Sequence, residues 1–187
     1  MASLTSRGCS KGDMCPAAAT STIAEAVCSG TAVPRSRVVG LMTRLVAKSL
    51  VRVRETSGTL RYEFLHTIFD YAWEKLAASD ESDTVHRRLV AWALDLVARA
   101  GVELSGPAQA DWLEHLEVDH DNLRASLAWS TRRAAEAHDA AAASAAARLA
   151  AGLVRFWETR GYQREGRGRL SRVLDLPRDL LPAADLA

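Results

Sequence analysis

The sequence predicts a mainly α-helical protein with one small β-hairpin, and two observations carry this prediction. Apolar residues recur at helical spacing over most of the chain, and they alternate strictly with polar residues only within residues 50–65. The chain has 187 residues, of which 48% are hydrophobic. This is enough apolar surface to build the core of one large domain or of two small ones.

Two helices are expected before the hairpin. The first covers residues 22–29, and Gly30 follows it at a position where helices favour glycine as a cap. The second covers residues 38–49 and places its apolar side chains on one face. Residues 1–20 are rich in small and polar residues without periodicity, and they predict a poorly ordered N-terminal segment.

The hairpin and the helix after it complete a recognisable order of elements. Residues 51–54 and 61–64 each alternate apolar and polar side chains, and Gly58 lies in the turn between them. Residues 66–78 then return to helical spacing. Helix, helix, two-stranded wing and helix is the order of a winged-helix domain, which we place at residues 21–79.

All of the chain after residue 80 predicts helix. Gly101 and the Ser105-Gly106-Pro107 cluster are expected to interrupt one stripe of apolar residues, with Pro107 in the first turn of the next helix. An alanine-rich stretch at 140–151 continues to Gly161, where a helix should end. Paired helices separated by glycine predict that residues 80–187 form a helical linker and the beginning of TPR-like repeats.

Four segments carry motifs of a known family. They read LMTRLVAKSLV at 41–51, RYEFLHTIFDYA at 61–72, DHDNLRASL at 119–127 and FWETRGYQREGRGRL at 156–170. In this order they resemble the region that joins the winged helix to the first helical repeats in STAND-class ATPase transcriptional regulators. That class includes large LuxR-type and antibiotic-regulator proteins with an NB-ARC-like nucleotide domain.

The resemblance implies a regulatory and interaction fragment that is not an enzyme. In such a protein the winged helix senses the nucleotide state of an adjoining ATPase domain, and the helices bind a protein partner. No G-x-x-x-x-G-K-[ST] loop occurs in this sequence, so ATP or ADP would bind only with a separate nucleotide-binding domain. The resemblance also implies that His66 contacts the ADP phosphates in that setting.

The alternative hypothesis is a winged-helix regulator that binds DNA by itself. Four basic residues in or just before the second helix are candidates for phosphate contacts: Arg35, Arg37, Arg44 and Lys48. The wing residues Arg52, Arg54 and Arg61 would extend the footprint. The helix has no Asn or Gln with which to read bases. A remnant without function is a third possibility.

The remaining chemistry of the sequence favours structural roles. One acidic and histidine-rich cluster is expected to form a solvated face and not a metal site: His115, Glu117, Asp119, His120 and Asp121. The three cysteines (Cys9, Cys15 and Cys28) fit no zinc spacing. The arginine-rich stretch 160–172 is expected to be solvated, and the five tryptophans are expected to fill the core between helices. The chain has no membrane-spanning run or signal sequence, which predicts a cytoplasmic protein.

Overall fold

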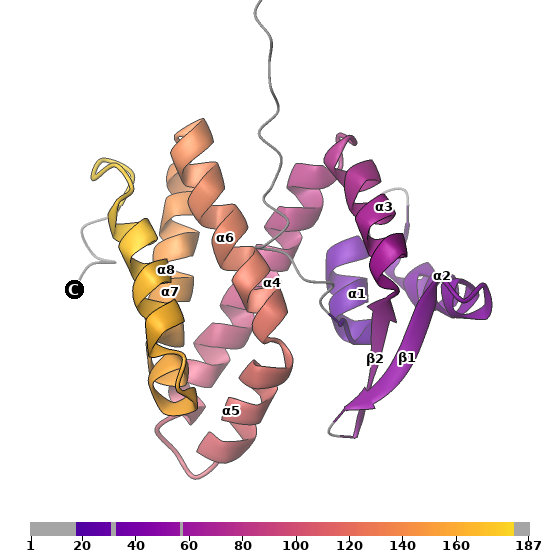
Figure 1. Cartoon of the computed structure of the whole chain (residues 1–187), viewed down its shortest axis with the longest axis horizontal. Helices are drawn as coiled ribbons and strands as arrows, with labels where there is room; N and C mark the ends of the chain where they lie inside the picture. The colour runs from indigo at the N-terminus through magenta and orange to yellow at the C-terminus, as the bar shows by residue number, and fades with distance from the viewer. Residues whose placement is uncertain (1–17, 31–32, 57, 182–187) are drawn as a thin grey trace, which may run out of the picture.

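The computed structural model describes residues 18–30, 33–56 and 58–181, apart from the side chain of His66. Its elements follow in this order: α1 Ser21–Cys28, α2 Arg35–Ala47, β1 Val51–Thr56, β2 Thr59–Phe64, α3 His66–Ala77, α4 Ser82–Glu103, α5 Gln109–Val118, α6 His120–Ala137, α7 Ala140–Arg160 and α8 Gln163–Leu174. Figure 1 shows α1, α2, the hairpin and α3 on one side, α5 to α8 on the other, and α4 between them. The mainly helical fold with a winged-helix-like layout is therefore confirmed.

The first two helices have ends that the sequence only partly predicted. Thr20 caps α1, because its hydroxyl accepts a hydrogen bond from the amide of Ile23 at 3.3 Å. The other end is capped by Ser29 in extended conformation, so the prediction of Gly30 as the cap was wrong. At the end of α2, Ser49 takes a left-handed conformation with φ of 56°, and the Leu50 amide reaches back to a helix carbonyl. This is the Schellman pattern.

The two strands form an antiparallel wing. Pairing runs from Val51 opposite Phe64 to Thr56 opposite Thr59, and Gly58 in the turn has a φ of 72°. Ala19 forms a bridge to Tyr62 through two backbone hydrogen bonds of 3.0 and 2.8 Å. Of the segment predicted to be poorly ordered, residues 18–20 therefore have a defined place beside β2, while residues 1–17 lie outside the described part.

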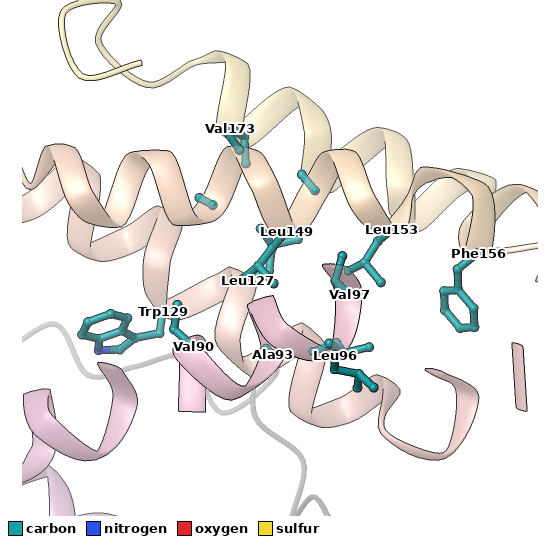
Figure 2. Packing of buried hydrophobic residues seen from close by; sticks show 14 of the residues in the cluster. Val90, Ala93, Leu96, Val97, Leu127, Trp129, Leu149, Leu153, Phe156 and Val173 are labelled. Carbon is teal, nitrogen blue, oxygen red and sulfur yellow. The ribbon is translucent and has the colours of Figure 1, made fainter. Parts of the chain in front are cut away.

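The main core lies where α4, α6 and α7 pack together, with α8 over α7 (Figure 2). Leu127, Leu149, Leu153 and Phe156 are almost completely buried there. Alanines on α7 let the helices approach closely. A Cβ atom added to Gly152 would lie 2.1 Å from a methyl group of Val97 on α4, so this crossing requires glycine. Trp129 and Trp157 are buried in the core, and Trp92 and Trp112 pack against it.

The predicted break at Gly106-Pro107 is confirmed, because α4 ends at Glu103 and α5 begins at Gln109, but the predicted break at Gly101 and the place of Pro107 inside the next helix were wrong. Helix α4 continues through Gly101 to Glu103, because this glycine is exposed and nothing packs against it. Pro107 precedes the cap of α5 at Ala108 and so lies outside the helix. Gly161 ends α7 as predicted, with a φ of 85°. None of the helices in the described ranges is long and apolar enough to cross a membrane.

Candidate functional site

The outer side of α2 carries a stripe of basic residues. Arg37, Arg44 and Lys48 are spaced by seven and four residues, which places them on nearly the same side of a helix at 100° per residue. All three side chains are exposed. None has a carboxylate within 4 Å among the described residues, so their charges face solvent. We call these three residues the basic stripe.

The wing adds two arginines that share one carboxylate. On β1, Arg52 Nε lies 2.9 Å from Glu63 Oε2, and Arg54 Nε lies 3.7 Å from the same oxygen. Both arginine side chains are more than half exposed. Because two positive charges meet one negative charge, this face of the wing keeps a positive surplus.

Arg61, which the sequence grouped with these phosphate contacts, lies elsewhere. Its side chain is only 5% exposed and donates to Asp119 Oδ1 at 2.6 Å. It also donates to the carbonyl oxygen of Ala18. The prediction of a DNA contact at Arg61 was therefore wrong. The corner between α5 and α6 covers this part of β2, which strand alternation alone does not reveal.

Around Arg61, a small polar network joins the wing to the helical half. Asn122 on α6 donates from Nδ2 to Asp119 Oδ1 and to the carbonyl oxygen of Ala18, both at 3.2 Å. Asn122 is buried. The network therefore ties β2, the segment before α1 and the start of α6 together, and we call it the wing joint.

A second ion pair holds α6 against α8. Arg124 forms a two-pronged contact with Glu165, with N–O distances of 2.7 and 2.5 Å. Burial alone would raise the pKa of Glu165, but the hydrogen bond and charge of Arg124 outweigh it and hold that pKa below its usual value. In turn, Glu165 raises the pKa of the Arg124 guanidinium.

His120 lies beside this pair, between aromatic rings. Its ring centre is 5.0 Å from that of Phe156 and 4.6 Å from that of Tyr162. Burial lowers the pKa of His120, and the nearby charge of Arg124 lowers it further, against the opposite effect of Glu165. Its buried Nε2 has no hydrogen-bond partner in the described structure. A neutral imidazole is therefore favoured here.

The acidic and histidine-rich cluster of residues 115–121 does not converge on one point. Asp119 turns toward Arg61, His120 turns into the aromatic contact with Phe156, and His115 is exposed. Within the described ranges, no three His, Cys, Asp or Glu side chains are arranged to hold a metal ion. Cys9 and Cys15 lie outside those ranges, and Cys28 is exposed without a disulfide.

The arginine-rich stretch near α8 is partly neutralised. Arg160 lies 3.1 Å from Glu114 and 3.7 Å from Glu117, and Arg169 lies 3.7 Å from Glu165. Three other arginines on α8 are exposed: Arg164, Arg167 and Arg172. His66 is the first residue of α3, but its side chain lies outside the described part, so a phosphate contact there stays a prediction.

The sequence did not predict these two ion pairs, although all four of their residues belong to the family-like motifs. Arg61, Asp119, Arg124 and Glu165 come from three of the four family-like segments. The structure brings those segments together through the pairs Arg61–Asp119 and Arg124–Glu165. The signal was the presence of opposite charges in separate motifs, but a single sequence does not say which charges meet.

Comparison with known proteins finds similarity to a few curated sequences. No protein-family model matches the chain, and no solved structure matches it. Three curated proteins, one from Mycobacterium bovis and two from strains of Mycobacterium tuberculosis, are 34% identical to it over 153 residues. This alignment covers 80% of the chain and 16% of each relative. Their names assign them to the HTH-type transcriptional regulators. The chain therefore spans about a sixth of the length of the curated relatives that it matches.

Proposed function

We propose that this chain is the winged-helix part of a transcriptional regulator and contacts duplex DNA through α2 and the wing. The observation that carries the proposal is the basic stripe, with three exposed cations on one side of a helix. On the wing, Arg52 and Arg54 add two more exposed cations. The HTH-type regulators of Mycobacterium that match the chain support the same class.

The chemistry of this surface favours phosphates over bases. Arginine and lysine neutralise phosphate charges and release counterions, so such binding weakens steeply with salt. Helix α2 has no Asn or Gln, and the hydroxyl of its Thr43 donates to the Val39 carbonyl at 3.0 Å. We therefore propose that this chain supplies affinity and orientation and that base readout comes from other surfaces.

Titration of labelled duplex DNA with the purified chain, followed by anisotropy, tests the proposal. The variant Arg37→Ala/Arg44→Ala/Lys48→Ala should lose most of its affinity at low salt. The matched control is Arg164→Ala/Arg167→Ala/Arg172→Ala, which removes three exposed charges from α8 and should bind as the wild type does. Equal loss in both variants would show attraction by net charge only, and loss in the control alone would move the contact to α8.

The wing joint favours a second candidate, in which the chain couples an adjoining domain to its helical half. A buried ion pair between β2 and the start of α6 would make the wing move together with these helices. This fits the STAND-class hypothesis, with an NB-ARC-like ATPase domain as partner, His66 near ADP phosphates and α4 to α8 as the start of a TPR-like surface. In this candidate the chain itself is non-catalytic. ATP hydrolysis above background by the rigorously purified chain would contradict it.

A further inference from the structure

An apolar cavity of about 360 Å³ lies in the middle of the winged-helix half. Its walls come from three sides: Ile23 and Val27 on α1, Leu41 and Leu45 on α2, and Phe64 on β2. Leu89 of α4 and Asn122 of α6 line it as well. The wing joint therefore forms one edge of this cavity, which we call the wing groove.

Among the described residues, the apolar face of α2 has no full partner at the wing groove. Val38 on that face is 3% exposed, yet Leu41, Met42 and Leu45 remain partly exposed although they line the same cavity. Helix α2 packs against α1 and β1. An amphipathic helix is stable when its apolar stripe is buried, and here a void meets part of the stripe. One more element with apolar side chains would fill it.

The charges around the wing groove indicate the chemistry of that element. Three exposed basic residues of the basic stripe belong to the helix that lines the groove, whereas the arginines of the wing alternate with the groove-lining Val51 and Phe64 and so lie on the opposite face of the hairpin. Arg35 at the start of α2 is paired with Glu25 at 2.8 Å, so the positive surplus beside the groove comes from the basic stripe. On α2 the basic stripe lies next to Leu41, within about 60° of helix rotation at 100° per residue. A partner that seats apolar side chains in the cavity would therefore meet cations beside them.

We propose that the wing groove binds an amphipathic α-helix of a protein partner that carries acidic residues beside its apolar stripe. Two or three side chains of leucine or methionine size would enter the cavity, in the way that helix-in-groove interfaces use anchors at i, i+3, i+4 and i+7. The acidic residues would pair with the basic stripe and select against basic helices. The inference does not depend on whether the chain binds DNA.

The first test uses a synthetic helical peptide of about 16 residues, which is long enough for four turns. Its leucines stand at positions i, i+3, i+4 and i+7, and glutamates flank them on the helix surface. A matched peptide carries lysine in place of each glutamate. Cys28 lines the groove, so its alkylation rate reports occupancy in a Cys9→Ser/Cys15→Ser background. The glutamate peptide should slow alkylation and bind at least about tenfold more tightly than the lysine peptide.

Two variants test the roles of the cavity and of the basic stripe separately. Ala24→Leu fills the cavity from α1 and should abolish peptide binding while circular dichroism and the melting temperature stay at or above wild type. Arg37→Glu/Arg44→Glu should reverse the preference to the lysine peptide.

Equal binding of both peptides, or binding of neither, would overturn the proposal. Binding of a small apolar dye that Ala24→Leu abolishes, without peptide binding, would instead assign the cavity to small molecules. DNA anisotropy on the same samples reports the DNA proposal separately.

Discussion

Arg61 on β2 and Asp119 at the start of α6 are 58 residues apart in the chain, yet a guanidinium nitrogen of Arg61 lies 2.6 Å from Oδ1 of Asp119. Both side chains are largely buried, at 5% and 14% exposure. Breaking one partner of a buried pair leaves an uncompensated charge, whereas replacing both with apolar residues costs much less. This pair is therefore a contact that would make the wing and the helical half move together, beside the packing of α1 against α4.

The first prediction concerns this pair. Arg61→Met or Asp119→Leu alone should lower the free energy of unfolding by about 3 kcal/mol, and the double variant should lose clearly less than the sum. Urea unfolding followed by circular dichroism measures all four species of the cycle. Strictly additive losses would mean that the two side chains do not stabilise the fold as a pair.

The second prediction concerns the crossing of α4 and α7. Gly152→Ala would place a methyl group 2.1 Å from Val97 Cγ1, so we expect a loss of about 1–3 kcal/mol from overpacking. Val97→Ala removes the obstructing methyl groups and should restore part of the loss in the double variant. The exposed Gly101→Ala is the control, since nothing lies near its Cβ position, and it should be neutral or stabilising. A stable Gly152→Ala protein would contradict the close crossing.

The third prediction uses the end of α2. Ser49 has a φ of 56°, a conformation that costs a non-glycine residue about 1 kcal/mol, and the Schellman hydrogen bonds hold it there. Ser49→Gly should therefore raise the free energy of unfolding by roughly 0.5–1 kcal/mol, and thermal melts would show it as a higher Tm. Ser49→Val should destabilise instead. If both variants melted like the wild type, the left-handed cap would be absent in solution.

The fourth prediction concerns pH. Burial lowers the pKa of His86 and of His120, so the unfolded chain binds protons more readily than the folded one. The contribution of these two histidines to the free energy of unfolding is fully present above their pKa in the unfolded chain, about 6.5. It is lost as the pH falls below that value. Glu165, whose pKa is also lowered, adds a further loss below its ordinary value of 4.5. Urea midpoints measured from neutral to acidic pH should fall accordingly.

Substitution of the two histidines isolates their contribution to the pH dependence of stability. His86→Gln/His120→Gln should flatten the stability profile between about pH 5 and pH 6.5 and leave the loss at lower pH in place. His86 stacks on Trp129 at a ring distance of 5.4 Å, so tryptophan fluorescence gives a local readout of its protonation. A wild-type profile that is flat across this range would contradict the lowered pKa values.

The elements of this fold could be predicted from the sequence because their signals are local. Spacing of apolar residues located the helices, and alternation around Gly58 located the wing. Contacts between distant segments gave no such signal. Arg61 has the same local pattern as Arg52 and Arg54, yet only Arg61 is covered by the helical half. The wing groove was likewise invisible, because a stripe of apolar residues on α2 does not say how much of it is filled.

The most direct test of the central claim is the salt dependence of DNA binding by the wild type and by Arg37→Ala/Arg44→Ala/Lys48→Ala. Each phosphate contact contributes a slope of about −0.9 to the plot of log K against log salt concentration. The account predicts that the triple variant has a slope shallower by about 2 to 3, while the matched α8 variant keeps the wild-type slope. Identical slopes in the wild type and the triple variant would contradict a DNA contact through the basic stripe.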